Sequence, residues 1–231
     1  MPCFDIVKKV KAPHSFRTQA IISNFDIDTA HIDEHFKGEI DLQNDWQVGL
    51  IVGGSGTGKT TIAKEVFKDA YFCAYEYTAD AVIDDMPKAS VKDIEKAFTA
   101  VGFSSPPSWL KPYAVLSNGE KMRVDLARCI LDNKPLIVFD EFTSVVNREC
   151  AKTTACAIAK AIRRSDKQFV AVSCHDDIVE WLQPDWIYDT DQKRFFTQRE
   201  STIAHQLNLK YTGLATDIKS KCGKYLGSIT I

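Results

Sequence analysis

The residues best suited to chemistry lie in a glycine-rich turn, Gly53–Thr61, which reads GGSGTGKTT between an apolar run and a helical pattern. The turn matches the pattern G-x-x-x-x-G-K-[ST]. Glycines have no Cβ, so their backbone N–H groups can surround an anion, and the start of a helix favours negative charge. We therefore expect the turn to bind the phosphates of a nucleotide. The residues predicted to do so are Gly54, Ser55, Gly56, Thr57, Gly58, Lys59, Thr60 and Thr61.

Two side chains of this turn and two acids further along the chain predict a metal-assisted reaction. Lys59 supplies a mobile positive charge for the β- and γ-phosphates, and the Thr60 hydroxyl is placed to ligate Mg²⁺. The apolar run LIVF ends in Asp140 and Glu141. We expect Asp140 to hold Mg²⁺ opposite Thr60, and Glu141 to polarise the attacking water. The alternative, that the two acids form only a solvated turn, is less favoured downstream of a phosphate-binding turn.

A second helix start offers another anion-binding end. The run LSNGEKMR, Leu116–Arg123, places a small hydroxyl and a glycine ahead of a helix, and Ser117 with Glu120 has the spacing of a capping box. Local physics alone favours an ordinary capped helix here. A lone histidine, His175, follows a predicted strand in the run VSCH. Taken in isolation, a histidine at a strand end is most often structural or exposed.

Composition bounds the class of protein. The 231 residues suit one α/β domain, with ordinary hydrophobic and charged fractions of 45% and 26%. The net charge of −2 gives no general attraction to nucleic acid or to anionic membranes. Apolar runs are strand-length and the N-terminus has no secretion signal, so we expect no membrane span. Seven cysteines without C-x-x-C spacing predict reduced thiols and a cytoplasmic location rather than disulfides or a zinc site.

The first part of the chain predicts an antiparallel β layer beside a parallel core. Apolar residues alternate loosely between Cys3 and Ile27, which indicates two strands around a turn near Ala12–Ser15. Glu39–Leu42 has the pattern of a third short strand, ahead of the strand that leads into the phosphate-binding turn.

The rest of the chain alternates helices and strands, which predicts a mostly parallel α/β sheet with ligands at the carboxyl ends of its strands. Helices are predicted over Ser90–Val101, from Ser117 onward, over Arg148–Arg164 and over Asp177–Leu182. Buried strands are predicted at Pro135–Asp140 and Gln168–Cys174, and edge strands at Trp186–Asp189 and Arg194–Thr197. The proline-rich stretch Ser104–Pro112 is predicted to be a rigid loop.

The order of these motifs resembles that of the ATP-binding-cassette (ABC) ATPases, from about Cys3 to Asp191. The resemblance implies a P-loop NTPase of the ABC type, with a mostly parallel sheet core, an N-terminal antiparallel β layer and a short helical subdomain at about residues 72–134. The ATPase domain then spans residues 1–200, and a tail of uncertain structure spans residues 201–231.

The same resemblance implies a role for each site residue. Lys59, Glu141 and His175 are catalytic, and His175 contacts the γ-phosphate of ATP. In this family the signature loop reaches the ATP of a partner subunit, so two subunits lie head-to-tail around two ATP molecules. The residues that match the signature loop are Ser117, Gly119 and Glu120. We therefore expect a homodimer that forms on ATP binding and acts on an unknown protein partner.

Three longer segments look like a narrower group, the bacterial and phage ABC-type ATPases that are often fused to a GNAT-type acetyltransferase domain. The segments are SSPPSWLKPYAVLSNGE, VFDEFTSVVNRE and FVAVSCHDDIVEWLQPDWIYD. In that group the ATPase half precedes the acetyltransferase half. This sequence ends about where the second domain begins there, so we expect no acetyltransferase activity.

The sequence also departs from the ABC pattern. No glutamine lies between Thr61 and Ser117, where the family has its glutamine loop, and Glu76, Asp84 and Asp85 are the open candidates to replace it. Asn147 stands where the family usually has aspartate. The aromatic residue that stacks on adenine is Phe16 or Phe25 if either does so, but core packing is the favoured role for both.

The predicted function is Mg²⁺-dependent ATP binding and hydrolysis that drives or regulates a partner. The alternatives are a non-hydrolysing ATP-sensing module, a DNA-associated clamp or repair ATPase, and a transporter ATPase subunit. A small-molecule kinase would leave LSNGE and His175 unexplained. Nucleic-acid contact is weakly supported, because a solvated face explains the basic residues Lys121, Arg123, Arg128, Arg163 and Arg164 equally well.

Overall fold

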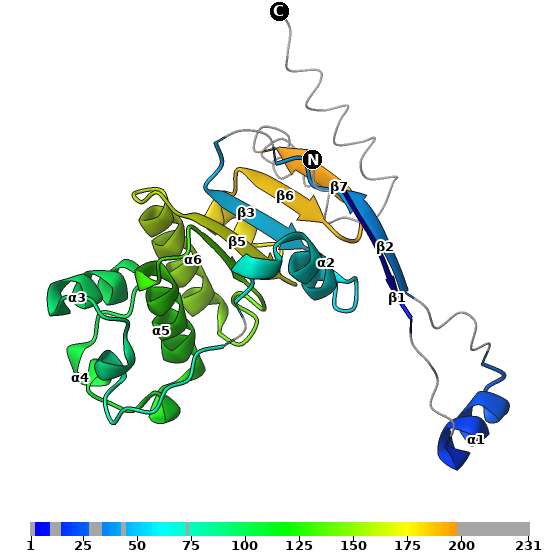
Figure 1. The fold of residues 1–231 in the computed structure, drawn as a ribbon, viewed down its shortest axis with the longest axis horizontal. Helices are drawn as coiled ribbons and strands as arrows, with labels where there is room; N and C mark the ends of the chain where they lie inside the picture. Colours follow the sequence, from blue (N-terminus) through cyan, green and yellow to red (C-terminus); the bar gives the residue numbers. More distant parts are fainter. Residues whose placement is uncertain (1–2, 10–14, 28–33, 43–44, 73, 198–231) are drawn as a thin grey trace, which may run out of the picture.

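The computed structural model describes residues 3–9, 15–27, 34–42, 45–72 and 74–197. Its centre is a five-stranded sheet with the strand order β4-β5-β3-β6-β7 (Figure 1). The strands are β3 (Val48–Val52), β4 (Leu136–Phe139), β5 (Gln168–Ser173), β6 (Trp186–Asp189) and β7 (Arg194–Thr197). The first four strands of this order are parallel, and β7 is antiparallel to β6. The predicted fold class, a mostly parallel α/β sheet, is confirmed.

Helices cover both faces of the sheet, which explains why the central strand β3 has no polar side chain and is buried at every position. In β3, Leu50 lies in a core with α5 (Asn118–Leu131), α6 (Arg148–Ile162) and α7 (Ile178–Leu182). The neighbouring Ile51 lies in a second core, with Ile62 and Ala63 of α2 (Lys59–Val66). Successive strand residues point to opposite faces, so one short strand contributes to both cores.

An antiparallel ribbon of β1 (Cys3–Lys8) and β2 (Glu34–Glu39) joins the second core through Phe4, whose ring meets Tyr188 edge-on at 5.5 Å. Figure 1 shows α1 (Phe16–Asn24) at the far end of this ribbon, away from the sheet. The antiparallel layer is therefore confirmed. The second strand predicted within Cys3–Ile27 is wrong, because Ser15 and Thr18 form a capping box that starts a helix.

The third predicted strand was also misplaced, since the strand ends at Glu39 and Glu39–Leu42 lies almost wholly outside it. The predicted turn near Ala12–Ser15 falls mainly on residues 10–14, and the predicted tail on 201–231; both lie outside the described residues. No helix within the described ranges is long and apolar enough to cross a membrane.

The helical subdomain lies between β3 and β4 in the chain and projects to one side of the sheet (Figure 1). After α2 and η2 (Lys68–Ala70), the region predicted as this subdomain, about residues 72–134, contains η3 (Val82–Asp85), α3 (Val91–Ala100), α4 (Pro106–Trp109), η4 (Tyr113–Val115) and α5. Ser90 caps α3 by accepting the Asp93 N–H at 3.2 Å, as its spacing predicts. The predicted loop Ser104–Pro112 is wrong in part, because Pro106 is tolerated in a first helical turn and opens α4.

The predicted helices at Arg148–Arg164 and Asp177–Leu182 and the two buried strands are confirmed to within two residues. Of the two predicted edge strands, only Arg194–Thr197 is at an edge. Trp186–Asp189 lies between β3 and β7 and is buried throughout. Its Trp186 ring stacks on Phe67 at 6.2 Å, which is an interior environment.

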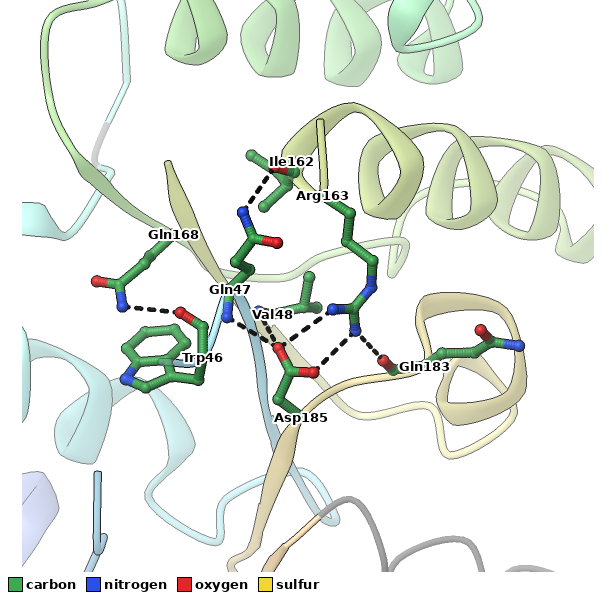
Figure 2. Close-up of polar contacts among 8 residues, drawn as sticks. All are labelled: Trp46, Gln47, Val48, Ile162, Arg163, Gln168, Gln183 and Asp185. Atoms are coloured by element: carbon green, nitrogen blue, oxygen red, sulfur yellow. Dashed lines mark hydrogen bonds and ion pairs between the residues drawn. The ribbon is translucent and has the colours of Figure 1, made fainter. Parts of the chain in front are cut away.

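Polar contacts lock the amino ends of the strands together (Figure 2). The Asp185 carboxylate accepts the backbone N–H groups of Gln47 and Val48, at 2.8 and 2.9 Å, where β3 begins. Arg163, just after α6, donates to Asp185 at 3.1 Å and to the Gln183 carbonyl at 2.6 Å. These contacts join the starts of β3 and β6 to the end of α6, and because β3, β4, β5 and β6 are parallel, their carboxyl ends lie at the opposite edge of the sheet.

Candidate nucleotide-binding site

The phosphate-binding turn follows β3 and has the backbone its glycines predict. Gly56 and Gly58 have φ of 82° and 88°, a region that side chains rarely adopt. A Cβ on Gly58 would also lie 2.3 Å from the Phe36 ring of β2, so glycine is required there. One backbone N–H of the turn, that of Gly54, is donated to the Asp191 carboxylate at 2.9 Å.

Lys59 is held across this turn. Its side chain is buried, at 8% exposure, and its Nζ donates to the Gly54 carbonyl at 2.5 Å. Thr57 Oγ1 donates to the same carbonyl at 2.9 Å. The ammonium group thus contacts the backbone of the turn that is predicted to hold the phosphates of a nucleotide.

Thr60 and Asp140, predicted to share a metal ion, are brought together by the sheet. Thr60 Oγ1 at the start of α2 donates to Asp140 Oδ2 at 2.7 Å. The other carboxylate oxygen, Oδ1, accepts the Glu141 N–H at 2.9 Å. One carboxylate and one hydroxyl form a hard oxygen donor set of the kind Mg²⁺ takes beside substrate phosphates, so these residues fit that ion.

Glu141 stands in a bent loop just after β4. It adopts φ of 51°, and Thr143 two residues on adopts φ of 67°. Both are left-handed values that cost energy in residues other than glycine and gather at functional sites. Phe142 N–H donates to the Val172 carbonyl at 2.8 Å and fixes the bend. The Glu141 side chain is exposed at the edge that carries Asp140.

His175 follows β5, the strand that lies between β4 and β3, so it comes to the same edge as Asp140 and the turn. Its backbone N–H donates to Ser173 Oγ at 3.1 Å, and its side chain is half-buried. The following helix is held by an ion pair between Arg148 of α6 and Asp177. His175 thus follows the strand next to β3, and its contact with the γ-phosphate stays a prediction.

The signature residues form a separate structure at the start of α5. Ser117 accepts the Glu120 N–H at 3.3 Å, and Glu120 accepts the Ser117 N–H at 2.9 Å, which is the predicted capping box. The Ser117 backbone N–H donor lowers the pKa of the Glu120 carboxyl below its usual range. A groove of about 330 Å³ beside Ser117, Gly119 and Glu120 is otherwise lined by Arg123, Val145, Val146, Asn147 and Cys150.

No residue of the phosphate-binding turn lines this groove. The structure thus brings together the turn, Asp140, Glu141 and the strand that ends before His175, but it leaves Ser117, Gly119 and Glu120 apart. Asn147, the departure from the family's aspartate, caps α6 by accepting the Cys150 N–H at 2.8 Å. Asparagine and aspartate cap helices about equally well, so the asparagine at this position keeps the cap of α6.

Two contacts at the site are not predicted from the sequence. The Asp191 carboxylate accepts the Gly54 N–H, and the Tyr71 hydroxyl donates to Asp140 Oδ2 at 2.5 Å. Neither residue belongs to a motif, so no local signal marks it. Of the candidates for the missing glutamine, Asp85 accepts the Thr78 and Ala79 N–H groups within the helical subdomain. Glu76 offers its main-chain carbonyl to Arg128 at 2.9 Å.

The prediction that Phe16 and Phe25 pack in the core is wrong. Phe16, in α1, is 90% exposed, and Phe25, just after α1, is 71% exposed. Adenine stacking by either stays a prediction. Four of the five basic residues considered for nucleic acid have partners within the fold. Arg123 donates to Thr154 Oγ1, Arg128 lies over the Tyr75 and Tyr77 rings, Lys121 lies over Tyr113, and Arg163 pairs with Asp185.

Comparison with known proteins agrees with this geometry. A model of the ATPase family associated with various cellular activities (AAA) matches residues 49–164, half of the chain. The mRNA export factor elf1 of Schizosaccharomyces pombe is 31% identical over 94 residues, 41% of this chain and 8% of that protein. The thiamine import ATP-binding protein ThiQ of Histophilus somni is 32% identical over 88 residues, 38% of this chain and 40% of that protein. The matches thus span less than half of either relative.

Among solved structures, the dimeric structure of MJ0796, a bacterial ABC transporter cassette, superposes with a TM-score of 0.56 at 15% identity, over 72% of this chain and 93% of that chain. At this identity the likeness concerns the fold alone. The ABC-type fold is therefore confirmed, whereas the resemblance to acetyltransferase-fused ATPases stays a prediction. Since the family match includes both the phosphate-binding turn and the Asp140–Glu141 edge, this chain belongs to the ATPase family associated with various cellular activities (AAA) and has the fold of an ABC ATPase domain.

Proposed function

We propose that this ATPase domain binds Mg·ATP between two copies of the chain, hydrolyses the β–γ bond, and so drives or regulates a partner protein. The observation that carries the proposal is the hydrogen bond between Thr60 and Asp140. It joins the helix start that follows the phosphate-binding turn to the carboxylate edge of β4. A triphosphate in the turn would then have its metal-binding groups and Glu141 on the same side.

The residues divide the chemistry between them. The amides of Gly53–Thr61 hold the phosphates, and Lys59 turns from the Gly54 carbonyl to the γ-phosphate. Thr60 and Asp140 would hold Mg²⁺, which would supply positive charge beside the phosphate oxygens. The exposed Glu141 carboxylate accepts a hydrogen bond from the attacking water and orients it in line with the bond that breaks. His175 donates a hydrogen bond to the γ-phosphate.

The second copy is needed because Ser117, Gly119 and Glu120 stand at their own groove, away from the turn of the same chain. In a head-to-tail pair, the start of α5 from each subunit would lie against the γ-phosphate held by the other. Such an arrangement is isologous and closes with two-fold symmetry. The similarity of the fold to a cassette described as dimeric supports this arrangement.

The test is sizing and phosphate release measured on the same sample, with and without Mg·ATP. We expect phosphate release that needs Mg²⁺, and a doubled mass when hydrolysis is blocked by Glu141→Gln. Tight ATP binding without phosphate release would instead support the ATP-sensing module. A chain that binds ATP but stays monomeric under every condition would contradict the two-fold arrangement.

A transporter subunit is the second candidate, because the relatives include a thiamine import ATP-binding protein and the similar fold is that of a transporter cassette. This candidate predicts co-purification with a membrane protein. The DNA-associated clamp predicts a salt-sensitive shift of DNA that ATP enhances. It is less favoured, because most of the basic residues it would use already have partners in the fold.

A further inference from the structure

The hydroxyl of Tyr71 lies at the carboxylate that the proposed function assigns to the metal. It donates to Asp140 Oδ2 at 2.5 Å, and Thr60 Oγ1 donates to the same oxygen at 2.7 Å. A hydrogen bond to a charged carboxylate is shorter and stronger than one between neutral groups. Asp140 is therefore oriented by two hydroxyls, of which only that of Thr60 belongs to a sequence motif.

The backbone around Tyr71 is fixed, so this contact is built into the fold. Tyr71 forms a parallel bridge with Val138, two residues before Asp140 on β4. The next residue, Phe72, donates its N–H to the Val138 carbonyl at 2.8 Å. The Tyr71 ring packs in the second core, and Lys64 Nζ lies 5.0 Å from its centre.

The aromatic residues that follow Tyr71 lie against α5, and the Phe72 ring packs on that of Tyr75 at 5.0 Å. Tyr75 donates to Asp132, and Tyr77 donates to Asp125 Oδ1 at 2.7 Å. The Arg128 guanidinium lies over both rings, 4.3 Å from that of Tyr75 and 4.9 Å from that of Tyr77. Ring contacts thus lead from the neighbour of Tyr71, through Phe72 and Tyr75, to the helix whose first turn carries the signature residues.

We propose that Tyr71 is a positioning residue of the metal site, which holds Asp140 for Mg²⁺ and passes a displacement of that carboxylate to α5. The proposal rests on the proposed Mg·ATP site. If Asp140 Oδ2 shifts to hold Mg²⁺, the Tyr71 phenol that stays hydrogen-bonded to it would shift as well. The neighbouring Phe72, whose ring packs on that of Tyr75, would pass this change to α5.

The first experiment uses Tyr71→Phe, which removes the hydroxyl and keeps the ring, its packing and its contact with Lys64. Calorimetry measures the affinity for Mg²⁺ at saturating ATP and, separately, the affinity for ATP in a chelator. We expect the Mg²⁺ dissociation constant to rise about tenfold, the size of a charge-assisted hydrogen bond, with metal-free ATP binding changed less than about twofold. Tyr188→Phe, at a buried tyrosine of β6, is the matched control and should change neither.

A measurement on the unaltered chain guards against a variant that fails to fold. With ¹³C-labelled tyrosine, adding Mg²⁺ to the ATP complex should shift the ring signal of Tyr71 and leave that of Tyr188 in place. A Tyr71 signal that does not move, or an unchanged Mg²⁺ affinity in Tyr71→Phe, overturns the positioning role. A wild-type chain that binds no Mg·ATP overturns the proposed function, and this inference with it.

A double-mutant cycle tests the link to α5. Tyr71→Phe and Tyr77→Phe, alone and together, are compared for the Mg·ATP-dependent dimerisation constant in the Glu141→Gln background. Each single change should weaken dimerisation, and the double change should cost less than the sum of the two, because both interrupt one connection. Strictly additive effects would remove the link to α5 and leave only the local role at Asp140.

Discussion

Gly119 of α5 lies so close to Cys150 of α6 that a Cβ on the glycine would be 2.9 Å from the cysteine sulfur. Beside this contact, Arg123 donates to Cys150 Sγ at 3.2 Å and to Thr154 Oγ1 at 3.0 Å. The glycine of the LSNGE run is thus required by packing within its own subunit, whatever it also contacts across a dimer. Ser117, Gly119 and Cys150 line the same groove.

Gly119→Ala should therefore lower the free energy of unfolding by about 1–3 kcal/mol, the usual cost of an overpacked contact. The measurement is denaturant unfolding without nucleotide. Cys150→Ala makes room for the added methyl, so the same change made in that background should cost clearly less. Equal losses in the two backgrounds would mean that the sulfur is not what the new Cβ meets.

Lys59→Ala should weaken ATP binding about 10- to 100-fold, because a charge-assisted contact to the phosphates is lost. Calorimetry gives the affinity, and the circular dichroism spectrum checks that the fold is intact. Lys64→Ala, at an exposed lysine of the same helix, serves as the control and should bind ATP nearly as well as the wild type. Unchanged affinity in Lys59→Ala would argue against phosphate binding in the turn.

Glu141→Gln should stall the reaction with ATP bound, since a neutral amide accepts a weaker hydrogen bond from the attacking water than a carboxylate does and polarises that water less. The expected result is a doubling of mass on sizing when Mg·ATP is present, together with loss of phosphate release. Glu65→Gln, on the exposed side of α2, should behave as the wild type. A monomer at saturating nucleotide would contradict the proposed dimer.

The capping box of α5 predicts a pH dependence of stability. The Ser117 N–H lowers the pKa of Glu120 in the folded chain below its ordinary value of 4.5. A depressed carboxyl pKa adds stability above the unfolded value, and that stability is lost as the pH falls through the folded value. Glu120→Gln should thus lower the free energy of unfolding at pH 7, and the difference from the wild type should shrink below about pH 4.5.

The effect should be small, because Glu120 is only half-buried and solvent screens its contacts. Thermal unfolding of the two proteins at a series of pH values between 7 and 3 measures it. A difference that stays constant across this range would show that Glu120 contributes through packing and not through its charge.

Predictions from sequence succeeded where a few neighbouring residues decide the structure. The turn around Gly56 and Gly58 and the capping box at Ser117 depend on backbone freedom and on side chains three residues away. Predictions failed where pairing between strands far apart in the sequence decides which residues are buried. Trp186–Asp189 has the pattern of an edge strand, and only its position between β3 and β7 buries it. Phe16–Asn24 has strand-like composition, but the Ser15 cap forms a helix.

The sequence by itself determined that a glycine-rich turn, a capped helix start and a pair of acids after a strand exist, because each depends on a short run of residues. Only the tertiary structure decided which of them meet. Asp140 receives hydrogen bonds from Thr60, 80 residues earlier, and from Tyr71, 69 residues earlier. Such contacts depend on the order in which parallel strands pair. Pairing between residues this far apart produces no repeating pattern in the sequence from which it could be predicted.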